Sequence, residues 1–212
     1  MSLEGKLEKQ VQRLLASEDE SPGGRLLEDA KRLWRRVGRF LDLNLAPPDV
    51  DRQSIELACY ALHLPDRGGK PAGRLGQVNL RERAEQAAEL LVSGLSDDAD
   101  EQLIERTARL LRELPVRAPK LVEAKLVADA VNLDDFGVTG LILQAMQLAR
   151  QQGSLTAVAE GFVKRQQYGY WEARLKDGFH FEPVRQMART RLESARQAAG
   201  LLLEELREDQ TL

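Results

Sequence analysis

The segment IELACYALHLPD, residues 55–66, decides the fold of this chain. Seven of the eight residues from Ile55 to Leu62 are apolar, and Glu56 is the exception. A helix that is apolar on nearly all sides is buried at the centre of a protein, whereas a surface helix keeps a polar face. The segment therefore predicts a central helix that ends at His63, one of two histidines in the chain, because Pro65 cannot continue it.

The rest of the sequence predicts further helices around this one. Leu, Ala, Arg, Glu and Gln favour helices and are frequent throughout, and no segment shows the alternation of apolar and polar residues that is typical of a strand. The helices are expected at residues 3–16, 26–43, 55–63, 79–92, 98–114, 121–129, 138–151, 155–177 and 183–208. We predict an all-α, single-domain bundle of about eight or nine helices. Residues 1–20 are expected to form an N-terminal helix that packs on or flanks a domain of residues 21–212.

Length, charge and cysteine content narrow the class of protein. A chain of 212 residues is long enough to bury a core. With 31 Lys and Arg against 34 Asp and Glu, the net charge is −3, so no overall positive field attracts nucleic acid or an anionic membrane. The single cysteine, Cys59, excludes an internal disulfide, and the sequence shows neither a signal-peptide pattern nor an apolar run of membrane-spanning length. We expect a cytoplasmic protein with no membrane partner.

Four segments occur in an order that resembles a known family. They are EDAKRLWRR at residues 28–36, IELACYALHLPD at 55–66, RAEQAAELL at 83–91 and LVEAKLVADAVNLDDFG at 121–137. This order resembles the HD superfamily of metal-dependent phosphohydrolases, in particular its stand-alone bacterial type, over nearly the whole chain. That family carries a histidine in its first helix, LLHD at the end of an apolar helix, and a third signature, DADRLDALG. The resemblance implies a helical cavity for a nucleotide or another phosphorylated ligand.

The resemblance assigns roles to individual residues. Asp29 falls where the family has its first metal-binding histidine, and His63 falls on the histidine of the His-Asp doublet. Asp129 falls on the closing metal-ligand aspartate. Asp134 matches the second aspartate of that signature, so the resemblance gives it a catalytic role in orienting the ligands or the attacking water.

The sequence departs from the family pattern at the doublet, where Leu64 replaces the aspartate. A divalent metal lowers the pKa of bound water from about 16 towards 7 and so supplies hydroxide for attack on phosphorus. Leu64 has no donor atom for such a metal. The remaining set of one imidazole and two carboxylates would suit Mn²⁺ or Fe²⁺, and Mg²⁺ less well. We therefore expect either no cofactor or one of these divalent metals.

Each candidate residue also has an interpretation that needs no metal. His63 could satisfy helix-terminal carbonyls or interact with the helix dipole. Asp129 lies among apolar residues and needs a partner, which a helix cap or a salt bridge would supply. Asp134 could cap the helix that follows it. Asp66, two residues beyond the lost doublet aspartate, is not expected to reach the site, because Pro65 favours a turn.

Arginines recur at three- and four-residue spacings along one side of residues 26–43, at Arg32, Arg35, Arg36 and Arg39. Such a stripe could hold phosphates, or it could be a solvated face paired with acidic neighbours. The net charge of −3 favours the second interpretation, and we do not expect a nucleic-acid partner. For a phosphorylated ligand, Arg32 and Arg67 are the candidate phosphate-binding residues.

Three functions stay open from the sequence, and with them the question whether the protein is an enzyme. The first is a diverged phosphohydrolase-like protein, weakly active or inactive, that is retained for ligand binding or assembly. The second is an active metal-dependent phosphohydrolase that acts on a nucleotide or other phosphate ester through Asp29, His63 and Asp129. The third is a non-catalytic helical interaction protein that forms a homodimer through leucines near its end, Leu201, Leu202, Leu203 and Leu206, although these could simply close the core.

Overall fold

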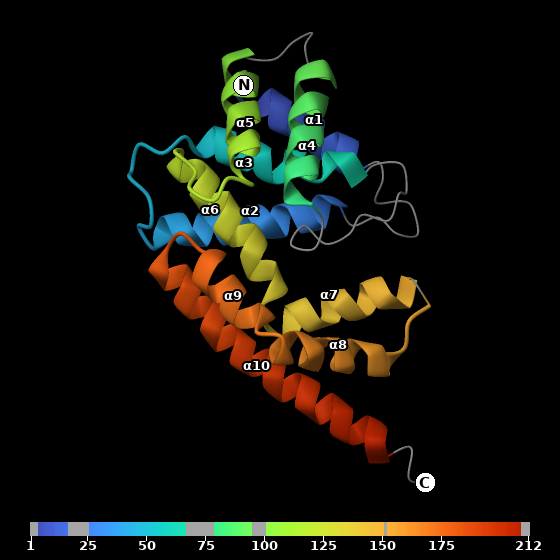
Figure 1. Ribbon diagram of the computed structural model, residues 1–212. Helices are drawn as coiled ribbons and strands as arrows, with labels where there is room; N and C mark the ends of the chain where they lie inside the picture. The colour runs from blue at the N-terminus through green and yellow to red at the C-terminus, as the bar shows by residue number, and fades with distance from the viewer. Residues whose placement is uncertain (1–3, 17–25, 67–78, 95–100, 151, 209–212) are drawn as a thin grey trace. The chain divides into compact units, whose positions relative to one another are not determined.

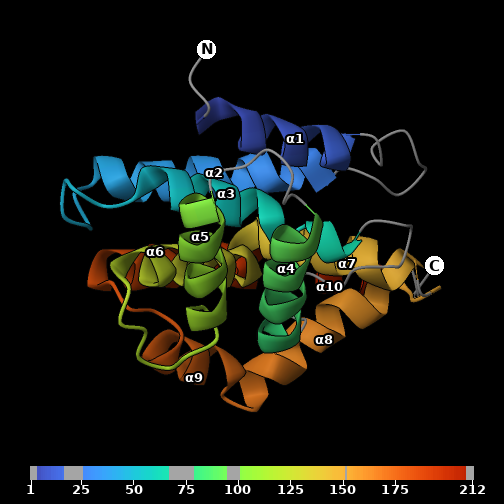
Figure 2. The same cartoon turned by 90° about the horizontal axis from the view of Figure 1, so that it is seen from above.

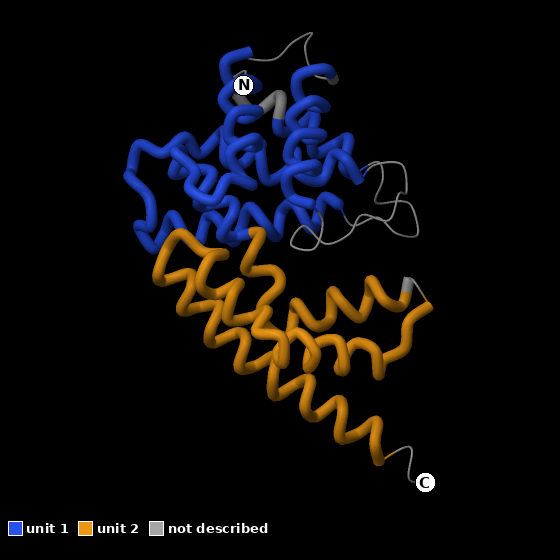
Figure 3. The backbone as a smooth tube through the Cα atoms, in the orientation of Figure 1, with its two compact units in different colours: residues 1–130 blue, residues 131–212 orange. Residues whose placement is uncertain are grey.

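The computed structural model describes residues 4–16, 26–66, 79–94, 101–150 and 152–208 (Figure 1). Within these ranges the chain forms ten α-helices and two short 3-10 turns and contains no strand, which confirms the all-α prediction (Figure 2). The chain divides into two compact units, residues 1–130 and residues 131–212 (Figure 3). The expected boundary between residues 20 and 21 stays a prediction.

The described part of unit 1 is built around α3. Its helices are α1 Glu4–Ala16, α2 Leu26–Asp42, α3 Arg52–Ala61, α4 Leu80–Gly94, α5 Glu101–Glu113 and α6 Val122–Asn132, of which the last two residues belong to unit 2. Helix α3 contacts α1, α2, α4 and α5, and α4 and α5 run side by side (Figure 1 and Figure 2). All apolar side chains from Ile55 to Leu62 are buried. The prediction of a buried central helix is thus confirmed.

Helix α3 begins where it does because Asp51 caps it. Oδ1 of Asp51 accepts a hydrogen bond from the backbone N–H of Ser54 at 3.1 Å, and Oδ2 accepts one from the Ser54 hydroxyl at 2.7 Å. A cap of this kind stabilises a helix by about 1 kcal/mol. The backbone N–H of Asp51 also donates to Glu123 of α6 at 3.2 Å, and Arg106 of α5 lies 3.3 Å from the Asp51 carboxylate. These contacts join the start of the central helix to α5 and α6.

Helix α2 lies against α3 with an apolar face. This face consists of Ala30, Leu33, Val37, Phe40 and Leu41, all buried. Burying a large apolar side chain contributes about 1.5–3 kcal/mol, so this face anchors α2 in one orientation. The arginines of α2 consequently lie beside or opposite the apolar face, where they meet other polar groups.

Unit 2 has an aromatic core. Its described elements are η2 Leu133–Asp135, α7 Gly137–Arg150, α8 Leu155–Gln167, α9 Tyr170–Asp177 and α10 Glu182–Glu208. Helix α10 contacts α7, α8 and α9. The ring of Trp171 is buried, with ring centroids 5.4 Å from Phe136 and 5.3 Å from Phe162. Phe179 completes this core, 5.3 Å from Phe136.

The segment expected as one helix over residues 155–177 is two helices. Helix α8 ends at Gln167 and α9 begins at Tyr170, and Gly169 between them has a φ of 68°. This left-handed conformation ends a helix, and glycine adopts it without the steric penalty of a Cβ. The break adds one helix to the nine expected ranges and explains the count of ten.

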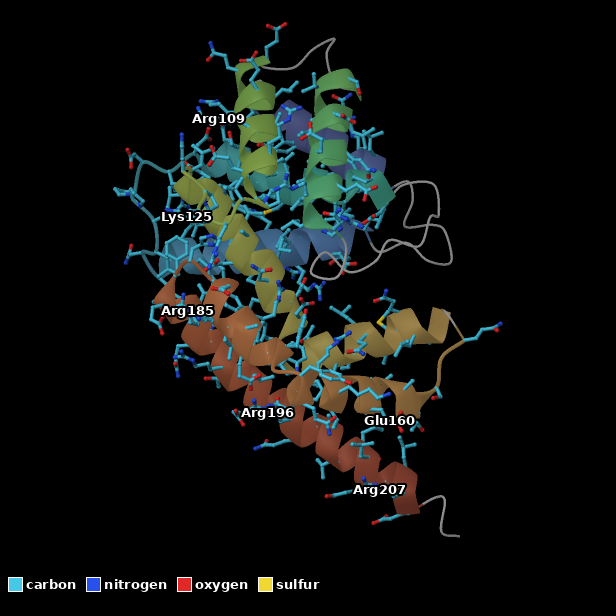
Figure 4. All side chains as sticks on the ribbon, viewed as in Figure 1. Arg109, Lys125, Glu160, Arg185, Arg196 and Arg207 are labelled. Atoms are coloured by element: carbon cyan, nitrogen blue, oxygen red, sulfur yellow. The ribbon has the colours of Figure 1, made fainter. Side chains whose placement is uncertain are left out.

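Helix α10 is 27 residues long and is held to its neighbours by polar side chains. Arg196, which Figure 4 labels, donates from Nε to Gln166 of α8 at 2.9 Å and from Nη2 to Glu172 of α9 at 3.2 Å. Arg185 donates to the backbone carbonyl of Phe179 at 2.7 Å.

Among the described helices, none combines the length and the apolar character that crossing a membrane requires.

Candidate functional site

The C-terminal end of α3 brings an imidazole and a carboxylate together. The backbone N–H of His63 donates to the Tyr60 carbonyl at 3.1 Å, and the N–H of Asp66 donates to the His63 carbonyl at 3.2 Å. These bonds tighten the chain into the 3-10 turn η1, Leu64–Asp66. As a result Oδ2 of Asp66 lies 4.0 Å from Nδ1 of His63, and both side chains are buried.

The position of Asp66 corrects the expectation that this residue cannot reach the site. Pro65 does favour a turn, as the sequence suggested, but the turn is what returns the Asp66 carboxylate to the His63 ring. Leu64, at the doublet position, is buried and apolar. A histidine and an aspartate are therefore neighbours here at a spacing of three residues instead of one.

Arg83 of α4 is the second partner of Asp66. Its Nη1 donates to Oδ2 of Asp66 at 2.5 Å and to the backbone carbonyl of Leu62 at 3.3 Å. The Arg83 and Asp66 side chains are 5% and 6% exposed, so this ion pair is almost completely withdrawn from water. A charge this deeply buried is tolerated only when it is paired and hydrogen-bonded, and Arg83 meets both conditions.

Sequence reasoning missed Arg83, although one signal for it exists. Arg83 shares a helix face with Ala87 and Leu91, at four-residue spacings, and all three are buried. An arginine in phase with the apolar face of a helix indicates a buried partner of opposite charge. Its partner could not be named from the sequence, because Asp66 lies 17 residues earlier in the chain.

Asp29 lies close enough to this pair for its charge to act on it. Burial raises the pKa of the Asp66 carboxyl, and the Asp29 charge raises it further, against the opposing hydrogen bond and charge of Arg83. Asp29 itself sits in the first turn of α2, where a negative charge is favoured by the helix dipole. Nη2 of Arg32 lies 3.2 Å from its carboxylate, and the Asp29 side chain is 44% exposed.

Asp129 lies on α6. Its side chain is completely buried. The neighbouring carbonyl of Ala130 accepts a hydrogen bond from Nη1 of Arg36 on α2 at 2.6 Å, so α2 holds this end of α6. The role of Asp129 as a metal ligand stays a prediction.

The described residues do not assemble a metal centre of the kind that the resemblance implies. Among them, no group of three or more His, Cys, Asp or Glu side chains is arranged to hold a metal ion. At the end of α3, the Asp66 carboxylate beside His63 is bound by a guanidinium, and the adjacent Leu64 offers no donor. Asp66 and Leu64 at the end of α3 therefore do not fit a divalent metal, and the ligand roles of Asp29, His63 and Asp129 stay predictions.

The basic stripe of α2 is paired with acidic or carbonyl groups along most of its length. Arg35 donates from Nε to the Lys31 carbonyl at 3.3 Å and lies 3.8 Å from Glu28. Lys31 lies 2.9 Å from Glu28. Of the two candidate phosphate-binding residues, Arg32 pairs with Asp29, and Arg67 lies outside the described residues.

Asp134 belongs to unit 2, in η2, where its side chain is buried. The next residue, Asp135, pairs through Oδ2 with Nη2 of Arg174 at 2.8 Å. The same nitrogen donates to Oδ1 of Asn132 at 3.0 Å, and Nδ2 of Asn132 donates to the Gly178 carbonyl at 2.5 Å. This network gives Asn132 a structural role. The catalytic role of Asp134 stays a prediction.

The leucines near the end of α10 lie in different surroundings. Leu201 is 61% exposed. Leu203 and Leu206 are partly buried and line a groove of about 420 Å³ between α8 and α10. The groove also contains charged residues, among them Glu160 and Arg207, which are labelled in Figure 4. The homodimer expected from these leucines stays a prediction.

Comparison with known proteins finds similarity of structure only. No protein-family model and no curated protein matches the sequence. The Lin1889 protein from Listeria innocua matches with a TM-score of 0.62 at 16% identity, covering 98% of each chain. Bacillus subtilis YpgQ, solved in complex with ADP, matches with a TM-score of 0.60 at 18% identity, covering 98% of this chain and 97% of its own. At these identities the likeness establishes the fold, over nearly the full length of the chain.

Proposed function

We propose that this protein is a diverged HD-superfamily protein that has lost metal-dependent hydrolysis and is retained to bind a phosphorylated ligand. A nucleoside diphosphate is the first candidate ligand. The order of the sequence segments supports the family, and the structural likeness to YpgQ, which was solved with ADP, supports the ligand class.

The Asp66–Arg83 ion pair beside His63 is the observation that carries this proposal. A carboxylate oxygen that accepts a guanidinium hydrogen bond at 2.5 Å has its charge neutralised and is a poor ligand for a second cation. A divalent ion next to His63 would also meet the positive charge of Arg83 at close range. Without that ion, the site lacks the means to convert water into a hydroxide nucleophile at neutral pH.

Arginines are the residues best suited to hold the phosphates in this proposal. The guanidinium of Arg32 sits at the first turn of α2, and Arg67 follows directly after η1 in the sequence. A guanidinium binds phosphate oxygens through paired, charge-assisted hydrogen bonds. Binding through Arg32 would require the phosphate to compete with Asp29 for the same guanidinium, which favours an anion of high charge.

Calorimetric titration of the purified protein with ADP tests the proposal. We expect saturable binding that is the same in EDTA as in Mg²⁺, because no step requires a bound metal. Arg32→Gln should weaken binding about tenfold or more, whereas Arg109→Gln should leave it unchanged, since Arg109 lies exposed on α5. Absence of ADP binding, or binding that EDTA abolishes, would contradict the proposal.

A hydrolysis assay decides between this proposal and the active phosphohydrolase. Nucleotide and phosphate-ester substrates are incubated with Mn²⁺, Fe²⁺ or Mg²⁺, with Asp129→Ala as the matched control. We expect no turnover above that control. Metal-dependent turnover that Asp129→Ala removes would favour the alternative, in which Asp29, His63 and Asp129 hold the ion and Asp134 orients the attacking water.

A further inference from the structure

We propose that the guanidinium of Arg83 is the built-in cation of the site at the end of α3, in place of the divalent metal that the family resemblance implies. This inference rests on the proposed loss of the metal. It identifies Arg83 as the group that now supplies positive charge next to the Asp66 carboxylate. It makes Arg83 a positioning residue, which holds the neighbouring groups in place and takes no part in a reaction.

The contacts of Arg83 match that task. A single nitrogen, Nη1, binds the Asp66 carboxylate at 2.5 Å and the Leu62 carbonyl at 3.3 Å. The first contact supplies positive charge to a buried carboxylate, and the second satisfies a carbonyl at the C-terminal end of α3, where the helix dipole favours a cation. Because Oδ2 of Asp66 also lies 4.0 Å from Nδ1 of His63, Arg83 holds the carboxylate beside the imidazole.

Two carboxylates around this point are each paired with an arginine. Asp66 and Asp29 bring two negative charges, and Arg83 and Arg32 bring two positive charges, each arginine within 3.2 Å of its own carboxylate. A divalent cation entering between these residues would have to displace a guanidinium, which is tethered to its helix and cannot diffuse away. In the wild-type protein both carboxylates therefore already have a counter-charge.

Replacing Arg83 should remove the counter-charge of Asp66 and so favour the binding of a divalent metal. With Arg83→Met, Asp66 keeps its buried position beside His63 but loses its counter-charge, and the nearby charge of Asp29 adds to the imbalance. The His63 imidazole and the Asp66 carboxylate, 4.0 Å apart, then offer Mn²⁺ one nitrogen and one oxygen ligand, both of kinds that it accepts. Arg83→Lys is the matched control, because the ammonium keeps the positive charge on a side chain of similar length.

Thermal unfolding of the full chain with Mn²⁺ or with EDTA tests the inference. For the wild-type protein we expect the same unfolding midpoint in Mn²⁺ as in EDTA, and for Arg83→Lys we likewise expect no difference between the two conditions. Arg83→Met should unfold at a lower temperature in EDTA and recover by about 5–10 °C when Mn²⁺ exceeds its Kd 100-fold. Adding Asp66→Asn to Arg83→Met should abolish the response to Mn²⁺, because the carboxylate that binds the ion is gone.

Two results would overturn the inference. If Mn²⁺ does not shift the unfolding midpoint of Arg83→Met, Arg83 is only a structural contact. If Mn²⁺ raises the midpoint of the wild-type protein as much as that of Arg83→Met, a metal binds in the presence of Arg83. If Arg83→Met does not fold in EDTA, refolding from urea is compared with and without Mn²⁺. Recovery only with Mn²⁺ supports the inference, and failure to recover in Mn²⁺ overturns it.

The proposed function and this inference can fail separately. ADP binding is measured on the wild-type protein, whereas the metal response is measured on the Arg83 variants without ligand. Wild type that fails to bind ADP refutes the ligand and leaves the assignment of Arg83 standing. Arg83→Met that ignores Mn²⁺ refutes the assignment of Arg83 and leaves ADP binding standing.

Discussion

Two short turns in this protein each end in an aspartate that pairs with an arginine, but their surroundings differ. The turns η1, Leu64–Asp66, and η2, Leu133–Asp135, are both three-residue 3-10 turns that follow a helix and end in an aspartate. In each unit that aspartate pairs with an arginine from a later helix, Asp66 with Arg83 at 2.5 Å and Asp135 with Arg174 at 2.8 Å. The arginines differ in exposure, 5% for Arg83 and 25% for Arg174.

The neighbours of the two pairs differ more than the pairs themselves. Around η2, the Arg174 guanidinium also donates to the Asn132 side chain, which in turn donates to the Gly178 carbonyl, so these contacts tie α9 to the turn. Around η1, the partners are His63 and the charge of Asp29. A buried ion pair is thus weak evidence for a functional site by itself. The chemistry of the groups that it holds in place decides its meaning.

Removing each aspartate should produce the largest contrast between the turns. Asp66→Ala strands the buried Arg83 charge, so we expect a loss of about 3–5 kcal/mol in the free energy of unfolding. Asp135→Ala should cost less, because Arg174 is one quarter exposed and keeps its bond to Asn132. Urea unfolding of both variants measures the difference in the free energy of unfolding. Equal losses of this free energy would show that the two ion pairs contribute equally to stability.

A glycine substitution sharpens the comparison on the side of η2. A Cβ added at Gly140 of α7 would lie 2.4 Å from the backbone carbonyl oxygen of Asp135, so the turn would have to shift. We expect Gly140→Ala to cost about 1–3 kcal/mol. Gly200→Ala in α10 is the matched control, because no atom lies within 4 Å of its added Cβ. That control should be neutral or stabilising by up to about 1 kcal/mol, and a Gly140→Ala variant as stable as it would contradict the close approach.

The smallest expected effect concerns the end of α3 at alkaline pH. Burial raises the pKa of Tyr60 to about 12, with the Glu56 charge contributing. An unfolded tyrosine ionises near pH 10, so between about pH 10 and 12 the unfolded chain releases a proton that the folded chain keeps. Stability should therefore fall as the pH rises through this window.

Tyr60→Phe should reduce that alkaline loss of stability without abolishing it, because burial also raises the pKa of the Cys59 thiol. Tyr168→Phe is the control, since Tyr168 is 85% exposed and should not alter the slope. Unfolding free energies measured in urea from pH 9 to 11 give the slopes. Identical slopes for Tyr60→Phe and wild type would show that the Tyr60 hydroxyl is not the buried group responsible.

Much of the fold could be predicted from local patterns. The apolar run from Ile55 to Leu62 predicted the buried central helix, and the apolar spacing of α2 predicted its bounds to within one residue. The prediction failed within residues 155–177, where helix-forming residues continue through Gly169. A glycine inside a helical pattern can stay helical or end the helix, and here the packing of Trp171 against Phe162 accompanies the second outcome.

Less of the candidate site could be predicted. The position of His63 at the end of an apolar run, and of Leu64 where the resemblance expects an aspartate, can be read from the sequence, because both concern adjacent residues. The return of Asp66 depends on how tightly the chain turns after His63, and the pairing with Arg83 depends on where α4 packs. Neither quantity is encoded in a short window of residues.

The sequence by itself determined that the chain is helical and which helix is central. It placed the end of that helix at His63, two residues beyond its last residue Ala61, next to a leucine where the resemblance expects an aspartate. These features follow from side-chain periodicity and from chain-terminating residues, both of which act locally. Only the tertiary structure decided that Asp66 lies 4.0 Å from His63 and that Arg83 pairs with it. The reason is physical: the energy of a buried charge depends on its distance from its partner and on its withdrawal from water, and both are set by packing between helices.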